Sequence, residues 1–187
     1  MKAIIFENNL LKVLISFVFS KITKRVYLGF FSPLRLLENN NDNITLSDTD
    51  VLVETILCGY CGTDKSILTY NMSVKSSVFV DTKRHKEKKI YLGHEIVGKV
   101  KNIGKKVINF SVGDHVILDS KIRDEAITAK NKYGGWSSQF VRDQSQLINI
   151  NRNLDIEKAV LIEPLACAFG ALRKSNIKSK DHILILG

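Results

Sequence analysis

The stretch GHEIVGKVKNIGKKV, residues 93–107, decides the interpretation of this 187-residue chain. It opens with His94 beside Glu95, an imidazole nitrogen and a carboxylate oxygen, which are two of the ligand types that zinc binds. Three glycines in the stretch let the backbone turn closely around such a pair. An isolated His-Glu pair is most often a polar piece of surface, but this glycine and valine spacing favours a metal site.

A second candidate ligand lies upstream, in the stretch GYCGTD at residues 59–64, directly after an expected strand. The thiolate of Cys61 could supply a third zinc ligand, while the Thr63 hydroxyl and the Asp64 carboxylate could serve a proton relay and support a ligand. Cys58 and Cys61 also have the spacing of a redox or zinc-knuckle pair. No second pair exists and no helix is evident after this one, so we expect Cys58 to be a buried strand residue.

A third candidate is Glu163, in the stretch LIEPLACA at residues 161–168. Apolar residues flank this carboxylate, and a buried carboxylate without a partner is costly, so a metal ion would be a suitable partner. The same residue could equally stand at a helix N-terminus, favoured there by the helix dipole and pointing to water. The sequence leaves both interpretations open.

Short apolar runs separated by turn residues predict a mainly β fold with some α-helix up to about residue 149. The expected strands are residues 2–6, 13–19, 50–57, 95–103, 115–119 and 138–142. Helical spacing begins at residue 156 and continues to 174, and Pro164 predicts that a new helix begins at Glu163 or Pro164. In residues 181–187, DHILILG, a polar lead precedes a four-residue apolar run that ends in Gly, which reads as the first buried strand of a doubly wound sheet. We therefore expect one domain over residues 1–155 and the start of another over 156–187.

Composition limits the classes of function. The 44% hydrophobic and 25% charged content is that of an ordinary globular protein. The net charge of +9 suits nucleic acid, but the densest basic run, residues 83–89, contains an acid and no aromatic residue for base stacking. We expect a solvated loop there and no nucleic-acid partner.

The cysteines and the most apolar stretch indicate in which cellular compartment the protein resides. Three cysteines without a disulfide pattern indicate a reducing, cytoplasmic setting. Residues 10–19 are strongly apolar, but Lys12 interrupts them and they are too short to span a bilayer. We expect a core strand pair there, not a targeting segment, and no membrane partner.

In their order along the chain, these motifs resemble the zinc-dependent medium-chain dehydrogenase/reductase family, which includes alcohol, sorbitol, threonine and glucose dehydrogenases. The resemblance covers most of the chain beyond Asp50, and its segments are residues 1–6, 61–64, 93–107, 112–116, 134–141, 163–168 and 183–187. It implies a GroES-like β-barrel followed by the first helix and strand of a truncated Rossmann domain.

The resemblance also implies roles for single residues. Cys61, His94 and Glu95 would be zinc ligands, and Glu163 would be a ligand or a partner of the bound water. Thr63 would pass the substrate proton outward, Asp64 would orient His94, and Gly187 would open the phosphate-binding turn of the cofactor domain.

The implied reaction is hydride transfer from a secondary alcohol or polyol to NAD or NADP. A thiolate, a neutral imidazole and one carboxylate balance the charge of Zn²⁺, so we expect one exchangeable carboxylate and an open position. We expect one catalytic zinc and no structural zinc, because residues 119–133 contain no cysteine. The fragment is expected to be inactive alone, with a homo-oligomer or a complementing C-terminal fragment as partner. A non-enzymatic zinc-binding β-barrel that acts as an interaction module is the alternative.

Overall fold

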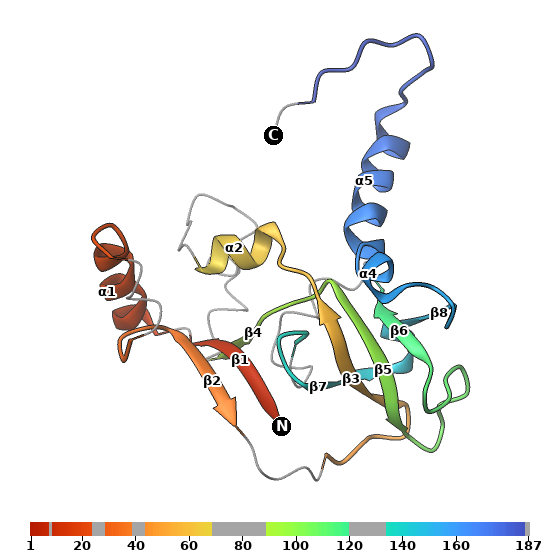
Figure 1. Cartoon of the computed structure of the whole chain (residues 1–187), viewed down its shortest axis with the longest axis horizontal. Coiled ribbons are helices and arrows are strands. Elements are labelled where there is room, and N and C mark those ends of the chain that lie inside the picture. Colours follow the sequence, from red (N-terminus) through yellow and green to blue (C-terminus); the bar gives the residue numbers. More distant parts are fainter. Residues whose placement is uncertain (8, 24–28, 39–43, 69–88, 120–133, 186–187) are drawn as a thin grey trace.

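The computed structural model describes residues 1–7, 9–23, 29–38, 44–68, 89–119 and 134–185. Within them, two antiparallel sheets occupy the middle of the molecule, with α1 at one end and α5 at the other (Figure 1). The mainly β fold with some α-helix is confirmed. The elements in chain order are β1 (Lys2–Glu7), α1 (Leu10–Ser20), β2 (Leu34–Glu38), β3 (Asp50–Cys58), α2 (Gly62–Leu68), β4 (Lys89–Tyr91), β5 (Ile96–Ile103), β6 (His115–Leu118), β7 (Gln139–Asp143), the 3-10 turn η4 (Gln144–Gln146), β8 (Leu147–Ile150), α4 (Ile156–Ala159) and α5 (Ile162–Ser175).

The larger sheet has the strand order β7-β3-β5-β6-β8. The first half of β3 alternates buried with more exposed residues, whereas β5, β6 and β7 each bury three successive residues. Val51 and Val53 of β3 are fully buried and pack with Val100 of β5 and Phe140 of β7. The predicted strands over 50–57, 95–103, 115–119 and 138–142 are confirmed to within a residue or two.

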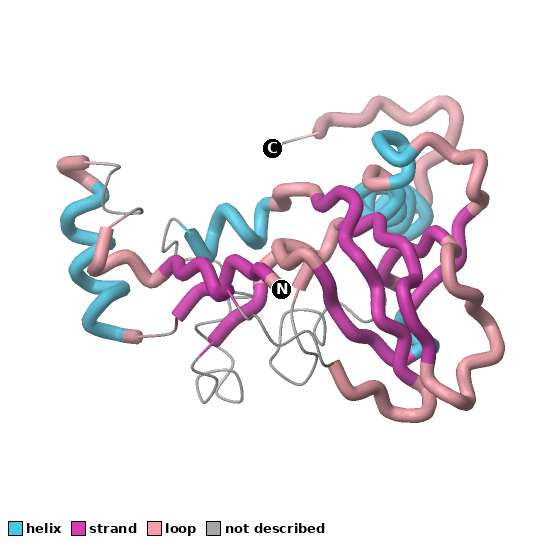
Figure 2. Tube along the Cα trace, turned by 60° about the horizontal axis from the view of Figure 1, so that its bottom comes forward, coloured by secondary structure: helices cyan, strands magenta, loops and turns pink. Residues whose placement is uncertain are grey.

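The smaller sheet has the order β2-β1-β4 and carries the chain's N-terminal strand in its centre. A bridge between Ala3 and Ser137, with the Ile4 N–H donating to the Trp136 carbonyl at 2.8 Å, ties it to the segment before β7. Ile67 of α2 is buried in the same apolar cluster as Phe6 of β1. Helix α2 is thereby held against this sheet, as the tube view in Figure 2 also shows.

The predicted strand over residues 13–19 is wrong, because this segment belongs to helix α1. Asn9 caps the helix by accepting a hydrogen bond from the Lys12 N–H at 3.2 Å. Lys12, Ser16 and Ser20 recur every four residues, which places them on one helical face. Because the residues between them are all apolar, this four-residue helical period is hard to recognise in the sequence.

The C-terminal region is helical as predicted. Pro164 lies in the first turn of α5, where its missing N–H is tolerated. The strand predicted over 183–187 is not seen in residues 183–185, which form no ladder. A strand is defined by its hydrogen-bonded neighbour, and the described residues offer this segment none. Residues 186–187 lie outside the described part.

The proposed domain boundary at residue 155 stays a prediction. Just beyond it, Ala159 of α4 is fully buried against Val97, Ile117 and Ile150 of the larger sheet. Strands β2, β4 and β8 were not predicted, and each is only three to five residues long. The polar loop over 39–43, the basic stretch up to residue 88 and the cysteine-free stretch over 120–133 lie outside the described residues. In the described part, no helix is long and apolar enough to cross a bilayer.

Candidate metal centre

Cys61 lies in the turn between β3 and α2. Its carbonyl accepts a hydrogen bond from the Lys65 N–H at 3.0 Å, and its Sγ accepts one from the Asp64 N–H at 3.3 Å. The sulfur thus caps the N-terminus of α2 and satisfies a donor that the helix leaves free. The expectation that no helix follows the cysteines is wrong, since α2 begins at Gly62, one residue after Cys61.

His94 and Glu95 lie in the connection between β4 and β5. The Sγ of Cys61 and the Nδ1 of His94 are 3.8 Å apart, and the ligand atoms of Cys61, His94 and Glu95 all lie within 4.8 Å of one another. Two ligands of one tetrahedral zinc, at ordinary Zn–S and Zn–N bond lengths, are separated by roughly 3.5 Å. A sulfur, a nitrogen and a carboxylate oxygen at these separations fit a zinc ion with only small adjustments.

Gly59 leaves the space that the Glu95 carboxylate occupies. A Cβ at position 59 would stand 2.2 Å from Oε2 of Glu95 and 3.0 Å from its Cβ. The Gly59 N–H also donates to the Glu95 carbonyl at 2.7 Å, so the backbones are held together. Sequence reasoning did not assign this role to Gly59, because the close approach is visible only in three dimensions.

Cys58 occupies a tight place behind the cluster. Its Sγ would lie 2.7 Å from a Cβ at Gly93 and 2.6 Å from one at Gly135, so both glycines are needed for its side chain to fit. Gly93 also has a φ of 83°, which other residues rarely adopt. The last residue of β3, Cys58 is half-buried, in line with its expected role as a strand residue.

Asp64 joins the two segments that carry the candidate ligands. Its buried carboxylate accepts a hydrogen bond from the Cys61 N–H on one oxygen and from the Gly93 N–H on the other, each at 3.2 Å. The predicted role was to orient His94. In the structure, the Asp64 carboxylate accepts its hydrogen bond from the backbone N–H of Gly93, the residue before His94, and not from the imidazole.

Burial controls the state of both thiols near the cluster. Burial raises the pKa of Cys61 to about 11, even though the Asp64 N–H bond to its sulfur acts in the opposite direction. Burial, with the Asp64 and Glu95 carboxylates, raises the pKa of Cys58 to about 12. Reactive redox cysteines have lowered pKa values, and the three cysteines are free thiols, so the redox-pair interpretation is not supported.

Glu163 lies in the first turn of α5 and is not a member of the three-residue group. Its side chain is buried, with 6% of the residue exposed, and its Oε1 accepts a hydrogen bond from the Cys167 thiol at 3.3 Å. The alternative placed this carboxylate at a helix N-terminus, which is confirmed, and pointing to water, which is wrong. A metal role for Glu163 stays a prediction.

Of the remaining predicted site residues, Thr63 lies beside Cys61. The Thr63 hydroxyl is close enough to Cys61 for its hydrogen bond to lower the pKa of that thiol, although burial raises it more. Gly187 lies outside the described residues. Sequence reasoning missed Trp136, whose ring stacks on Tyr60 at 5.9 Å beside the cysteine segment. Its only signal was its place after the paired glycines at 134 and 135.

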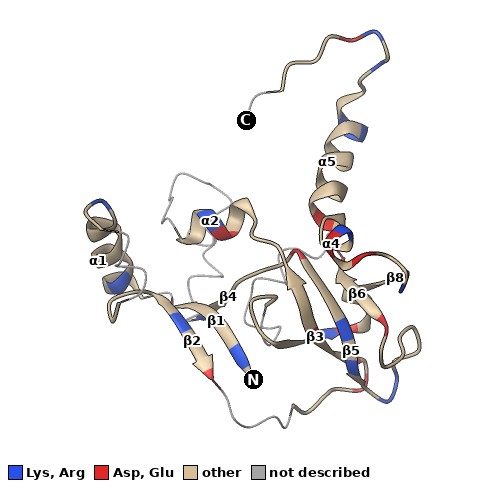
Figure 3. Ribbon diagram, viewed as in Figure 1, with Lys and Arg blue, Asp and Glu red and all other residues tan. Residues whose placement is uncertain are grey.

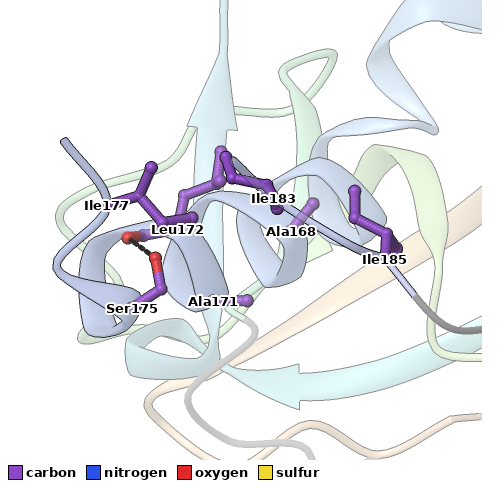
Figure 4. A pocket seen from close by; sticks show the side chains of 7 residues that line it. All are labelled: Ala168, Ala171, Leu172, Ser175, Ile177, Ile183 and Ile185. Atoms are coloured by element: carbon purple, nitrogen blue, oxygen red, sulfur yellow. Dashed lines mark hydrogen bonds between the residues drawn. The ribbon is translucent and has the colours of Figure 1, made fainter. Parts of the chain in front are cut away.

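A pocket of about 420 Å³ lies away from the cluster, between α5 and the segment that follows it (Figure 4). Its lining is apolar except for Ser175, and it offers no group that could bind a metal. The lining residues are Ala168, Ala171, Leu172, Ser175, Ile177, Ile183 and Ile185.

Comparison with known proteins identifies the family. Residues 47–152 match the alcohol dehydrogenase GroES-like domain. The chain is 25% identical over 178 residues to (R,R)-butanediol dehydrogenase of Saccharomyces cerevisiae, covering 75% of this chain and 45% of that protein. It is 32% identical over 161 residues to an uncharacterized zinc-type alcohol dehydrogenase-like protein of Haemophilus influenzae, covering 75% of this chain and 43% of that protein.

Solved structures agree on the fold. The crystal structure of 2R,3R-butanediol dehydrogenase from Bacillus subtilis has a TM-score of 0.61 at 24% identity, covering 79% of this chain and 46% of that one. Galactitol-1-phosphate dehydrogenase from Escherichia coli also has a TM-score of 0.61, at 17% identity, covering 94% of this chain and 45% of that one. The chain thus spans a little under half the length of these relatives. It belongs to the alcohol dehydrogenase GroES-like family, within the zinc-type medium-chain dehydrogenase/reductases.

Proposed function

We propose that this chain supplies the zinc-binding half of an alcohol or polyol dehydrogenase, with one catalytic zinc held by Cys61, His94 and Glu95. The observation that carries the proposal is the convergence of three different donor atoms, from two distant stretches, to within 4.8 Å. Glu163 is the fourth candidate, as an exchangeable ligand or a partner of bound water. A structural zinc is not part of the proposal, since residues 119–133 contain no cysteine.

Bound zinc would supply Lewis acidity that favours loss of the proton from an alcohol hydroxyl near neutral pH. The protein's part begins at Cys61, whose thiol is protonated without a metal because its pKa is raised to about 11. Metal binding therefore has to release that proton. With the thiolate formed and Glu95 ionised, the ligands would balance the charge of the ion. The role proposed for the Thr63 hydroxyl is to pass the substrate proton outward.

The substrate is proposed to be a small secondary alcohol or polyol. Support comes from relatives named as butanediol, D-arabinitol and L-idonate dehydrogenases, which are 24% to 26% identical to this chain. Tyr60 and Trp136, stacked beside the cysteine turn, are candidates for an apolar wall of the substrate site.

The coenzyme is proposed to be NAD or NADP, held by a dinucleotide-binding domain that begins near residue 156 and has its phosphate turn at Gly187. The apolar lining of the pocket on α5 is the surface that such a domain would cover (Figure 4). The chain spans about 45% of the length of the Saccharomyces cerevisiae relative. A complementing C-terminal fragment and a homo-oligomer are the proposed protein partners.

Cobalt substitution tests the proposed site. Replacing zinc by Co²⁺ should produce a sulfur-to-cobalt charge-transfer band, and adding 2,3-butanediol should change the cobalt ligand-field spectrum if a position is open. Cys61→Ser should abolish the charge-transfer band. Cys58→Ser, three residues away and of the same chemistry, should keep it.

Two results would contradict the proposal. Loss of the band in Cys58→Ser but not in Cys61→Ser would reassign the ligand. A cobalt spectrum that no alcohol changes would indicate a closed site, as in a zinc-binding interaction module.

A further inference from the structure

Helix α1 buries a single apolar residue, Val13, in the cluster that contains Phe6 of β1 and Ile67 of α2. The rest of its inward face includes Ser16, fully buried and donating to the Phe31 carbonyl at 3.1 Å, and Lys12, which is ion-paired with Glu7. In a globular protein the apolar stripe of a surface helix normally faces the core. Here the polar residues hold the helix to β1 and to the segment before β2.

The outward face of α1 is almost entirely apolar. Leu11, Leu14 and Val18 follow one another at spacings of three and four residues, so they lie along one side of the helix, and they are 67%, 50% and 55% exposed. Leu10, Phe17 and Phe19 are also exposed on the helix, and so are Phe30 and Phe31, whose backbone meets the helix at Ser16. A group of exposed apolar side chains on one helix face marks an interaction site.

The charge beside this face indicates what covers it. Among the described residues 9–23 and 29–37, Lys12, Lys21 and Arg35 are basic and none is acidic. In the described part, the Lys21 ammonium lies over the Phe17 ring at 5.1 Å and the Arg35 guanidinium over the Phe30 ring at 5.8 Å. Figure 3 shows basic and no acidic colouring on α1. Glu7 neutralises only part of this charge, since it pairs with both Lys12 and Arg35.

A second copy of the chain would bring two sets of Lys21 and Arg35 together, and these like charges would repel. A surface that offers both hydrocarbon and negative charge complements the face better. We propose that the outward face of α1 docks on a bilayer that contains anionic phospholipid. At 11 residues the helix is about 16 Å long, against a hydrocarbon core of about 30 Å, so it would lie in the interface and not cross it. This replaces the sequence-based expectation of no membrane partner, and it is independent of the zinc site.

Vesicle flotation with the whole chain tests the proposal, using phosphatidylcholine alone and an equimolar mixture with phosphatidylserine. The chain should float with the mixture, much less with phosphatidylcholine, and less with either as salt rises. Leu11→Gln with Leu14→Gln should weaken binding roughly tenfold or more, because the apolar contact is reduced. Lys21→Glu should weaken vesicle binding by a similar factor, because a positive charge is replaced by a negative one.

The matched control is Leu165→Gln with Leu172→Gln, which replaces two exposed leucines of another helix, α5. It should leave vesicle binding unchanged, and all variants should unfold at the parent's urea midpoint because the substituted residues are exposed. Failure of the parent to float with the mixed vesicles would overturn the proposal. So would a concentration-dependent dimer, measured by sedimentation, that the α1 variants abolish, because a second copy would then cover the face.

Discussion

At the scale of single residues, the candidate metal centre depends on groups that are not themselves ligands. Gly59 leaves room for the Glu95 carboxylate, and Asp64 holds the backbone segments of Cys61 and Gly93 together. The candidate ligands were predictable because the motifs that carry them follow one another in the order of the zinc-dependent medium-chain dehydrogenase/reductase family. These supporting contacts were not, because they depend on distances between β3, α2 and β5.

Gly59→Ala should lower zinc affinity roughly tenfold to a hundredfold, since the added methyl would displace the Glu95 carboxylate. The thermal midpoint of the metal-free protein should change little, because the atom displaced most is the end of a flexible side chain. Competition with a chromogenic chelator would measure the affinity. Gly62→Ala is the matched control, because a Cβ there meets nothing within 4 Å. Equal zinc affinity in the two variants would remove Gly59 from the account.

Asp64→Asn should destabilise the metal-free chain by about 1–3 kcal/mol, because one of two buried backbone N–H groups would face an amide N–H₂ in place of an oxygen. Zinc affinity should also fall, since the segments that carry Cys61 and His94 would no longer be held together. Urea unfolding and chelator competition would measure the two effects. Asp181→Asn, at an exposed residue that accepts a bond from Lys178, should change neither. A variant as stable as the parent would show that the Asp64 bridge is dispensable.

At the scale of elements, the long strands β3 and β5, of nine and eight residues, were predicted, and so were β6 and β7, of four and five residues. A turn at Val112, Gly113 and Asp114 that leads into β6 marks that strand in the sequence. β2, β4 and β8, of three to five residues, were missed. α1 was predicted to be a strand because a short apolar run can form either a buried strand or a helix with an exposed apolar face. The sequence does not show which side of the segment packs on the protein.

The turn between β5 and β6 depends on Asp114, which also contacts the end of β8. Its carboxylate accepts hydrogen bonds from the Arg152 guanidinium, the Ser111 N–H at 2.8 Å and the Asn149 amide at 3.1 Å. These contacts, that with Arg152 first, hold the pKa of Asp114 below its ordinary value of 3.8.

A lowered pKa in the folded state means that the ionised carboxylate stabilises the fold above its unfolded pKa. That stability is lost as the pH falls through the lower, folded pKa. Asp114→Asn should therefore destabilise the protein by about 1 kcal/mol near neutral pH, a modest value because Arg152 is exposed. The difference should begin to shrink as the pH falls below about 4 and should disappear only once the pH is below the lower, folded pKa.

Urea unfolding of parent and variant across pH would measure this difference. Asp48→Asn, which removes only an exposed ion pair with Lys106, is the control and should have little effect at any pH. A gap between parent and Asp114→Asn that stays constant into acid would contradict the assigned role of the carboxylate.

At the scale of the whole molecule, the candidate metal centre lies where the two sheets meet. Cys61 follows a strand of the larger sheet and leads into α2, which packs on the smaller one, while His94 and Glu95 connect β4 of the smaller sheet to β5 of the larger. A bound ion would therefore join the two sheets. The order of motifs predicted this architecture, but the apolar outward face of α1 follows from the three-dimensional arrangement alone.

Zinc should accordingly slow amide hydrogen exchange at residues 59–64 and 93–96, because both segments would be fixed to one ion. Exchange in β6 and β8, which contribute no ligand, should be unchanged. Mass spectrometry of the chain with and without zinc would show this. Protection spread evenly over every strand would indicate general stabilisation, not a site that joins these segments.

The most direct test of the central claim is zinc X-ray absorption on the purified chain, with metal content measured for the parent, Cys61→Ser and His94→Ala. The account predicts about one zinc per chain, bound by one sulfur with nitrogen and oxygen completing the site, and a large loss of metal in both variants at unchanged soluble yield. Equal zinc content in the parent and both variants, or a zinc bound without sulfur, would contradict it.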